Sequence, residues 1–539
     1  MLKRFLPTLA LFFVCCASFA QPKPKLVVGI VIDQMRWDYL YRFNKLYNDR
    51  GFNRLLSKGF SCENTMVPYV PTYTAVGHSC VYTGSVPAIM GIVGNSWFDK
   101  STGTLVYCTD DANVSGVGTT SAAGKMSPEN LWVTTITDEL RLSTNFKSKV
   151  IGIALKDRGA ILPAGHSANA AYWYEAGKWI SSTHYMNDLP AWVKQFNDKD
   201  NAGAYMSKDW NTLIPMDQYD QSTEDDKAYE GRILGETSST FPHKLSTIKA
   251  PDKYESFRTT PFANTFTFDF AKAAIENENL GKNSVTDFLA VSISSTDYVG
   301  HTFGPNSIEI EDTYLRLDKD IADFLQYLDN KIGKGEYLLF LTADHAVAHI
   351  PGFLQEHKIP AGLFSEADMT KSINQAVETE FGIKNVVSRL INYQVYLNSD
   401  EIEKKTKDVA AVRRTVIKTL KQKSFIIDAF ELDKLSSVTL PEPLKTRMIN
   451  GYNPQRSGDI QFTFRPGYFD GISKTGTTHG LWNPYDSHIP LLWFGWNIRQ
   501  GKLNRETYMT DISPTVAAML QIQMPSGCVG HVIPEVMLK

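Results

Sequence analysis

Five short apolar runs, rich in β-branched residues, are spread along this 539-residue chain, and long segments with helical patterns separate them. This spacing predicts parallel strands joined by crossover helices, because a parallel pair of strands needs a connection of a dozen or more residues. We therefore expect an α/β fold with a central, mostly parallel sheet sandwiched by helices. The runs are Leu26–Ile32, Val150–Leu155, Asp287–Ile293, Tyr337–Leu341 and Ile489–Phe494.

The composition is that of an ordinary globular protein, with 43% hydrophobic and 21% charged residues. A chain of this length can bury a large core, so we expect a single domain over residues 21–539, with accessory regions inserted at about 165–255 and 355–455. The apolar spacing predicts a long amphipathic helix at roughly Ser307–Lys331. The charged segment Glu401–Lys423 is interpreted as one solvated helical region.

The first twenty residues have the pattern of a signal peptide. Lys3 and Arg4 precede an apolar stretch, and Ser18–Ala20 forms a small-x-small cleavage site. The sequence therefore predicts export to the periplasm or beyond. No other segment reaches about 18 uninterrupted apolar residues, so no membrane span is expected.

The formal net charge is −3, and no run of Lys or Arg is present. We therefore expect no nucleic-acid-binding surface and a small, diffusing substrate. The mature chain keeps Cys62, Cys80, Cys108 and Cys528. In an oxidising compartment these predict one or two structural disulfides, with the pairing left open.

Acidic residues and histidines follow several of the predicted strands. Asp33 comes directly after the first run, Asp297 and His301 follow the third, and Asp344 and His345 follow the fourth. Because the carboxyl ends of parallel strands meet at one edge of a sheet, we expect these side chains to converge. Carboxylates and imidazoles suit zinc, with iron or manganese as alternatives. Five such ligands exceed the need of one ion, so the pattern favours two metals about 4 Å apart, which suits phosphoryl transfer.

A sixth ligand would complete the pair. His479 and His488 both flank the fifth run, and their chemistry alone does not separate them.

Seven motifs in order along the chain resemble those of the alkaline phosphatase superfamily, and specifically of its bacterial periplasmic phosphate-irrepressible alkaline phosphatases. Nucleotide pyrophosphatase/phosphodiesterases resemble the same core. The resemblance implies an alkaline-phosphatase-like fold and two Zn²⁺ ions. The motifs are Val28–Arg36, Pro71–His78, Thr83–Gly84, Ser294–Asp297 with His301, Thr342–His345, Gly476–Gly480 and Asp511–Thr515.

The same resemblance implies which residues hold each metal. One zinc is assigned to Asp297, His301 and His479, and the other to Asp33, Asp344, His345 and the oxygen of Thr74. His488 is then interpreted as structural or as a support for the ligands. Thr74, the second threonine of Pro-Thr-x-Thr-Ala, is implied to be the nucleophile that forms a phosphothreonine.

Three further residues are assigned to the phosphoryl group. Asn95 matches the phosphoryl-binding asparagine of the family. Lys156 and Arg158 follow the second run at two-residue spacing, and an extended backbone would point both to one side. By the resemblance they bind phosphoryl oxygens and favour monoesters. His166, nearby in sequence, is interpreted as structural.

The sequence therefore predicts a zinc-dependent alkaline phosphatase that hydrolyses phosphate monoesters. Two alternatives stay open: a nucleotide pyrophosphatase/phosphodiesterase, and a non-catalytic exported protein that binds metal or phosphate. The physiological monoester and the oligomeric state are not predicted.

Overall fold

The computed structural model describes residues 23–406, 408–471 and 473–538. The expected signal peptide, residues 1–20, lies outside these ranges. All five predicted strands form, with bounds that differ from the expected ones by at most one residue. They are β1 (Leu26–Ile32), β6 (Val150–Ala154), β9 (Asp287–Ile293), β10 (Tyr337–Thr342) and β17 (His488–Gly495).

These strands belong to one large sheet with the order β18-β2-β17-β10-β1-β9-β6-β7-β8-β5, and β19 pairs with β2. The strands β10, β1, β9, β6 and β7 run parallel to one another. The other members of the sheet are β2 (Phe60–Met66), β5 (Gly116–Val117), β7 (Ala170–Glu175), β8 (Lys178–Ser182), β18 (Gly501–Leu503) and β19 (Thr507–Tyr508).

The expectation that all five runs are parallel is wrong for β17, which pairs antiparallel with both β10 and β2. Thr342, at the end of β10, faces Leu491 near the start of β17. The chain thus enters β17 at the same edge of the sheet where β10 ends. An antiparallel strand can start there directly, whereas a parallel strand would require the chain to cross first to the opposite edge.

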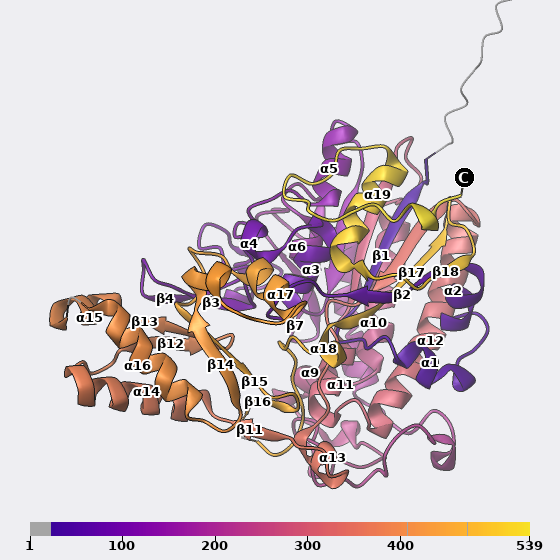
Figure 1. The fold of residues 1–539 in the computed structure, drawn as a ribbon. Coiled ribbons are helices and arrows are strands. Elements are labelled where there is room, and N and C mark those ends of the chain that lie inside the picture. The colour runs from indigo at the N-terminus through magenta and orange to yellow at the C-terminus, as the bar shows by residue number, and fades with distance from the viewer. Residues whose placement is uncertain (1–22, 407, 472, 539) are drawn as a thin grey trace, which may run out of the picture.

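Helices cover both faces of the sheet (Figure 1). One face carries α3 (Thr74–Thr83), α5 (Ile136–Ser143), α6 (Asp157–Ala164) and α19 (Ile512–Leu520), and the other carries α2 (Phe52–Lys58), α10 (Phe262–Asn277) and α12 (Ile308–Leu328). The predicted long helix is α12: the Ser307 side chain caps it by accepting a hydrogen bond from Ile310 N–H at 3.2 Å, and a π-helical turn, Asp329–Gly333, follows it. The α/β fold class is confirmed.

Shorter elements connect these layers. They are α1 (Tyr39–Arg42), α4 (Pro87–Met90), β3 (Ser96–Asp99), β4 (Thr104–Tyr107), α7 (Ala191–Asp198), α8 (Asn201–Tyr205), α9 (Asp252–Phe257), α11 (Ser295–Phe303), α13 (Pro351–Glu356) and α18 (Pro484–Ser487).

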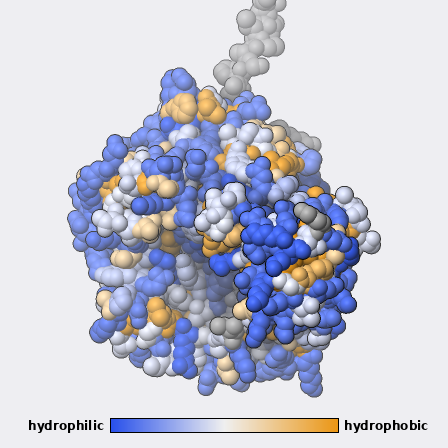
Figure 2. Space-filling model, turned by 90° about the vertical axis from the view of Figure 1, so that its left-hand side faces the viewer, coloured by the Kyte–Doolittle hydropathy of each residue, from blue (hydrophilic) through white to orange (hydrophobic). Residues whose placement is uncertain are grey.

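Residues 362–470, here called the accessory module, form a separate layer, drawn mostly in orange to the left of the main sheet in Figure 1. Its four-stranded antiparallel sheet has the order β12-β13-β15-β14, and it has its own apolar core, which includes Val395, Val416 and Phe462. Figure 2 shows that the side of the molecule carrying this module is mostly hydrophilic, with hydrophobic residues in small separate groups. The module contains β11 (Gly362–Phe364), α14 (Glu366–Phe381), β12 (Val387–Ile391), β13 (Gln394–Leu397), α15 (Ser399–Lys405), α16 (Val409–Lys421), β14 (Ile426–Glu431), α17 (Leu444–Gly451), β15 (Ile460–Phe464) and β16 (Tyr468–Asp470).

Two expected segments differ in detail. The charged region 401–423 is two helices, since α15 ends at Lys405 and α16 begins at Val409 after its cap, Asp408. The region 165–255 begins with β7 and β8, which extend the main sheet rather than pack on it.

The expected disulfides are absent: Cys62, Cys80, Cys108 and Cys528 are free thiols. The first three are fully buried, where a cysteine acts as a small apolar side chain. Burial raises the pKa of the Cys62 thiol to about 12, so it stays protonated. Across the described ranges, no helix combines the length and the apolarity needed to cross a bilayer.

Candidate active site

The residues predicted to bind metal come together at the carboxyl edge of the parallel strands. Two groups of side chains place their ligand atoms within 4.8 Å of one another. The first is Asp297, His301 and His479, and the second is Asp33, Asp297 and His345. Asp344 lies beside the second group, with its Oδ2 3.5 Å from His345 Nε2.

Successive elements deliver these side chains. Asp33 directly follows β1, and Asp344 and His345 follow β10. These are the positions after the strands that the sequence predicted. Asp297 lies in the first turn of α11 and His301 one turn later, so both face the same side of the helix. The distance from Asp297 Oδ1 to His301 Nε2 is 3.1 Å.

Backbone carbonyls hold the three histidine rings in one orientation. Nδ1 of His301 lies 2.8 Å from Thr477 O, Nδ1 of His345 2.9 Å from Ala346 O, and Nδ1 of His479 2.7 Å from Thr72 O. A carbonyl only accepts, so each Nδ1 carries the hydrogen, and each Nε2 keeps a lone pair that faces the carboxylates. This is the tautomer that a metal ligand requires.

Several of the same atoms are buried without a hydrogen-bond partner in the described part of the chain. They are Asp33 Oδ1, Asp344 Oδ2 and His345 Nε2. An unpaired buried polar atom is destabilising unless another group or an ion satisfies it. The unpartnered atoms are all of the types that bind divalent cations, so the residues present fit a pair of such ions.

Electrostatics favour the ligand forms of Asp297 and His479 but oppose that of Asp33. Burial alone would raise the pKa of Asp297, but His301 and Lys156 beside it lower the pKa well below its usual range. Burial, together with the neighbouring His345 and His301, lowers the pKa of His479, so its ring is neutral at neutral pH. Burial and the repulsion of Asp297 and Asp344 raise the pKa of Asp33.

Thr74 is the first residue of α3, and its exposure is 1%. A helix N-terminus favours negative charge, which suits a phosphoryl group at this position. The helix approaches the metal ligands closely because residue 77 is glycine: a Cβ there would lie 2.3 Å from Asp344 O.

Asn95 lies beside Thr74. Its Oδ1 accepts a hydrogen bond from the backbone N–H of Ala75 at 2.9 Å. Because the oxygen is engaged, the amide NH₂ is the group that remains to donate to a substrate. The residue stands in the loop before β3, and it is half-buried.

Lys156 sits among the carboxylates. Its Nζ donates to Asp33 Oδ2 at 2.7 Å and to Asp297 Oδ2, and it lies 3.5 Å from Thr74 Oγ1. Burial opposes its charge, but Asp297 and Asp33 raise its pKa above the usual value, so the ammonium group stays protonated.

The local geometry expected for Lys156 and Arg158 is wrong. The strand ends at Ala154, Lys156 is the N-cap of α6, and Arg158 lies in the first turn of that helix. Arg158 Nη1 donates to Tyr107 OH at 2.9 Å. Lys156 still reaches the cluster, because α6 starts at the carboxyl edge of β6, whereas Arg158 contacts Tyr107 and Asp157.

Two residues near the ligands had no role assigned from sequence. Gln34 has a left-handed backbone (φ 67°), donates from its N–H to Asp344 Oδ1 at 3.1 Å and from Nε2 to Asp297 Oδ1 at 2.6 Å. Gly300 makes room for it, since a Cβ at that position would lie 1.9 Å from Gln34 Oε1. Gln34 stands in the Val28–Arg36 motif, but only the folded chain shows that it contacts Asp297 and Gly300.

His78 is the second such residue. Its Nδ1 lies 2.9 Å from Thr74 O and 3.3 Å from Asp344 Oδ2, and its Nε2 lies 2.8 Å from Ser292 Oγ. It therefore links the backbone of Thr74 to the Asp344 carboxylate.

The two histidines interpreted as structural, His488 and His166, both contact other groups of the protein. His488 stacks on Trp37 with ring centroids 4.6 Å apart, and its Nε2 lies 2.9 Å from Glu63 O. His166 Nδ1 lies 3.0 Å from Asp138 Oδ2.

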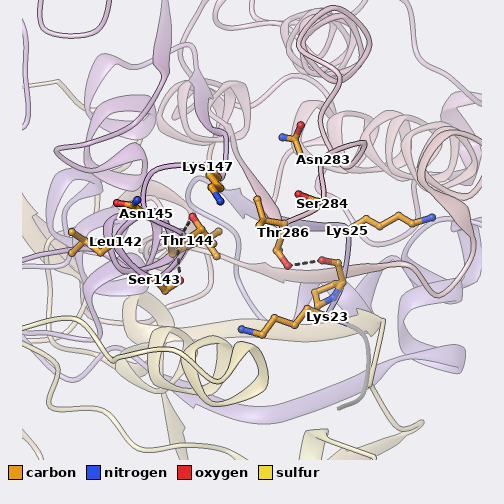
Figure 3. A pocket seen from close by; sticks show the side chains of 13 residues that line it. Lys23, Lys25, Leu142, Ser143, Thr144, Asn145, Lys147, Asn283, Ser284 and Thr286 are labelled. Atoms are coloured by element: carbon orange, nitrogen blue, oxygen red, sulfur yellow. Dashed lines mark hydrogen bonds between the residues drawn. The ribbon is translucent and has the colours of Figure 1, made fainter. Parts of the chain in front are cut away.

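A cavity of about 780 Å³ lies at the opposite edge of the sheet (Figure 3). Lys25, Lys147 and Thr286 line it, and each precedes one of the parallel strands β1, β6 and β9. It is therefore separated from the metal ligands by the length of those strands. Its lysines are exposed side chains.

Comparison with known proteins places the chain in a family. A family model described as type I phosphodiesterase / nucleotide pyrophosphatase matches residues 27–482. The chain is 51% identical to a protein named alkaline phosphatase PafA from Elizabethkingia meningoseptica, over 96% of this chain and 95% of that one. It is 53% identical to a Myroides odoratus protein named calcium-transporting ATPase, over 97% and 96% of the two chains.

A crystal structure of wild-type PafA matches with a TM-score of 0.94 at 50% identity, covering 96% of this chain and 100% of that one. A second PafA structure is of a variant in which one threonine, one asparagine, one lysine and one arginine are replaced. The chain belongs to the type I phosphodiesterase / nucleotide pyrophosphatase family. Within it, the chain is an alkaline phosphatase of the PafA type, which confirms the resemblance found in its sequence.

Proposed function

We propose that this chain hydrolyses phosphate monoesters in the periplasm, with two zinc ions and with Thr74 as the nucleophile. The observation that carries the proposal is the position of Thr74, at the N-terminus of α3 and beside the buried Asp/His cluster. The signal-peptide pattern of residues 1–20 supports the compartment.

The two metals have distinct ligand sets in this proposal. Asp297, His301 and His479 would hold one ion, and Asp33, Asp344, His345 and Thr74 would hold the other. When bound, the ions supply Lewis-acid chemistry that lowers the pKa of an attacking oxygen and offsets negative charge on a departing one.

The reaction has two displacements. Oγ of Thr74 bonds to phosphorus, its proton passes to solvent, and the bond from phosphorus to the ester oxygen breaks, releasing the alcohol after it takes a proton. Water then breaks the bond between Thr74 Oγ and phosphorus, which releases phosphate and restores the hydroxyl. The intermediate is a phosphothreonine.

Asn95, Lys156 and Arg158 bind the phosphoryl oxygens through both steps. Asn95 is fixed by Ala75 and offers its NH₂, and Lys156 lies 3.5 Å from the attacking oxygen. Their charge and donors stabilise the negative charge of the transition state. The PafA variant replaces these three residue types together with a threonine, the type proposed here as the nucleophile, which supports this choice.

A phosphate monoester dianion has one more charged oxygen than a diester. Two cations at the phosphoryl site therefore favour monoesters over the diesters of the nucleotide pyrophosphatase/phosphodiesterase alternative. The name of the Myroides protein agrees with this chemistry, since the terminal phosphoryl group of ATP presents similar oxygens.

The nucleophile is tested by comparing Thr74→Ala and Thr74→Ser with Thr83→Ala. Thr83 is a buried threonine at the other end of the same helix, and its Oγ1 donates to Ser79 O at 2.7 Å. We expect Thr74→Ala to lower kcat/KM for p-nitrophenyl phosphate on the order of a thousandfold or more, because the covalent route is lost. Thr74→Ser should retain part of the activity, and Thr83→Ala most of it.

Acid-quenched wild-type enzyme should carry one phosphate on the peptide that contains Thr74, detected by mass spectrometry. Thr74→Ala activity at the wild-type level would rule out the covalent mechanism. Zinc-loaded wild-type protein that turns over no p-nitrophenyl ester would instead favour the non-catalytic alternative.

A further inference from the structure

Three residues of the inserted region at about 165–255, here called the clasp (Tyr229–Gly231), bridge two segments of the metal cluster. The N–H of Gly231 donates to Thr302 O at 2.7 Å. The carbonyl of Tyr229 accepts from the N–H of Gly476 at 3.0 Å. Thr302 directly follows His301, and Gly476 lies three residues before His479. The clasp therefore contacts both segments that supply a histidine to the same proposed ion.

The two segments are also joined to each other at this place. The N–H of Thr477 donates to His301 O at 3.0 Å, and His301 Nδ1–H donates to Thr477 O at 2.8 Å. The second hydrogen bond is the one that turns the His301 Nε2 lone pair towards Asp297. The clasp binds the neighbour of each partner, Thr302 beside His301 and Gly476 beside Thr477. It therefore supports the hydrogen bond that orients a proposed ligand.

These contacts are close enough to require glycine on two of the segments. A Cβ at Gly231 would lie 2.7 Å from Thr302 O. A Cβ at Gly476, where φ is 80°, would lie 2.5 Å from His301 O. Both obstructing atoms belong to the backbone, which cannot turn aside as the end of a side chain can. The backbone therefore fixes the spacing between the clasp and the two segments.

The middle residue of the clasp, Glu230, is anchored in the protein interior. Its exposure is 5%, and Glu309, in the first turn of α12, is fully buried beside it. Burial, together with the charges of Glu309 and Asp225, raises the pKa of Glu230 to about 10. The Glu230 side chain therefore enters the interior in its neutral form at neutral pH.

The inserted region also holds the end of α11, the helix that carries Asp297 and His301. His243 packs edge-on against Phe303, the last residue of α11, with ring centroids 5.3 Å apart. Burial opposes a charge on His243, but Glu236 and Glu309 raise its pKa to about 9. Its two ring nitrogens lie 2.9 Å and 3.3 Å from the oxygens of these carboxylates. The clasp and this contact together fix the inserted region to α11.

We propose that the clasp is a positioning element for one of the two proposed ions, the one assigned to Asp297, His301 and His479. By holding the segments of His301 and His479 at a fixed spacing, the clasp sets the affinity of that site for zinc. Glu230 and Gly231 are the positioning residues. The ligands proposed for the other ion follow β1 and β10 and lie outside the segments that the clasp contacts. This inference rests on the proposed function, because it takes these three side chains as ligands of one ion.

The test measures the affinity of each ion in folded variants. Metal-free protein is titrated with zinc in competition with a chromophoric chelator, and elemental analysis counts the bound ions. Gly231→Ala pushes the clasp away from Thr302, and Glu230→Ala removes the buried side chain. Glu230→Gln keeps both the shape and the neutral state of that side chain.

Two matched controls are Gly471→Ala and Glu139→Ala. Within 4 Å, a Cβ at Gly471 would meet only the end of the Leu363 side chain, at 3.3 Å. Glu139 is a buried acidic residue of α5, with an exposure of 8%. Neither residue lies in the clasp or in the segments that the clasp contacts.

We expect Gly231→Ala and Glu230→Ala to weaken the binding of one zinc ion about ten- to one-hundredfold, the range for losing a group that orients a metal ligand. The affinity for the second ion should change less than about threefold, because its ligands are independent of the clasp. Glu230→Gln and both controls should keep the wild-type affinity for both ions. With zinc in excess, kcat/KM of Glu230→Ala for p-nitrophenyl phosphate should recover towards the wild-type value.

A double variant identifies which ion is affected. In His479→Gln, the ion that remains is the one assigned to Asp33, Asp344 and His345. Adding Glu230→Ala to His479→Gln should leave the affinity for that ion unchanged, whereas a further loss of affinity would show that the clasp does not act on the site of His301 and His479.

Equal weakening of both ions in Gly231→Ala and Glu230→Ala would overturn the proposal, as would unchanged affinity for both ions. A Glu230→Gln variant as weak as Glu230→Ala would overturn the role of Glu230 as a neutral anchor. Melting temperatures show which variants fold, and where one of the two does not, the other decides. Selective loss of one ion, in a protein whose wild-type form turns over no p-nitrophenyl phosphate, would support the clasp and reject the proposed catalytic function alone.

Discussion

Two carboxylates meet one ammonium group at the centre of the site, and a third carboxylate lies beside them. Lys156 donates to Asp33 and Asp297, and Asp344 receives hydrogen bonds from Gln34 and His345 backbone N–H groups. A charge in this environment is stable only when it is paired. Lys156 therefore balances the negative charge of Asp33 and Asp297 and also belongs to the proposed phosphoryl site. The metal content of any variant that lacks Lys156 should be measured before its kinetics are interpreted.

Replacing both cations of the proposed phosphoryl site should lower kcat/KM for a monoester much more than kcat/KM for a diester. In Lys156→Ala with Arg158→Ala, we expect kcat/KM for p-nitrophenyl phosphate to fall about a hundredfold or more, since two charged contacts to the dianion are lost. For bis-p-nitrophenyl phosphate the change should be within about fivefold, because a diester lacks the extra charged oxygen.

The matched control for this pair is Lys149→Ala. Lys149 precedes the same strand at its opposite end, and its Nζ donates to Glu278 O. It should leave both substrates unaffected, and metal analysis of each variant separates a lost contact from a lost ion. Wild-type enzyme that is more efficient on the diester would reject the monoester assignment.

At the scale of elements, the sequence predicts the central strands well because they are buried on both faces and read as continuous apolar runs. It does not predict the direction of β17, which depends on where the accessory module returns the chain. The sequence also does not predict the break between α15 and α16. The charged pattern continues through Asp408, which caps the second helix. The members of the candidate Asp/His cluster were predictable because each follows a strand or stands in a motif. The roles of Gln34 and His78 were not, because their partners are distant in sequence.

A hairpin of the accessory module contacts the loop that carries Asn95, a member of the proposed phosphoryl site. Its two turn residues, Asn392 and Tyr393, have φ angles of 58° and 59°, and they join β12 to β13. Asn392 Nδ2 donates to Ser96 O at 2.9 Å, directly after Asn95. Residue 94 must be small here, since a Cβ at Gly94 would lie 2.6 Å from Asn392 Nδ2. The hairpin thus positions the loop that carries Asn95.

Asn392→Gly should loosen that loop without straining the turn, because glycine accepts the same φ. We expect a fall in kcat/KM for p-nitrophenyl phosphate of about three- to tenfold, the range for one neutral hydrogen bond, and weaker inhibition by phosphate. Asn385→Gly is the control: Asn385 also has a positive φ of 35°, is exposed, and lies elsewhere in the module. Equal kinetics in both variants, at unchanged melting temperatures, would show that the hairpin does not position Asn95.

At the scale of the whole molecule, two hydrophobic cores meet near a polar centre. The main core lies on the two faces of the large sheet, and the accessory module has its own. Between the carboxyl ends of the parallel strands, one buried polar atom each of Asp33, Asp344 and His345 has no hydrogen-bond partner among the described residues. The fold therefore buries polar groups that have lost their contacts with water, which lowers its stability. Ions bound to these groups would offset that loss of stability.

Metal removal should consequently affect stability as well as catalysis. We expect about two zinc ions per chain, two being the number that the ligand groups imply. Chelation should abolish hydrolysis and lower the melting temperature on the order of 5–10 °C, because ions that bind only the folded state stabilise it. Readdition of zinc should restore both, whereas His479→Gln should bind about one ion fewer, because it removes one of three ligands of one ion. The readouts are elemental analysis, calorimetry and p-nitrophenyl phosphate turnover, repeated with manganese and iron. A chelated protein that contains no metal yet keeps its melting temperature and activity would contradict the two-ion site, and restoration by manganese but not by zinc would correct the identity of the metal alone.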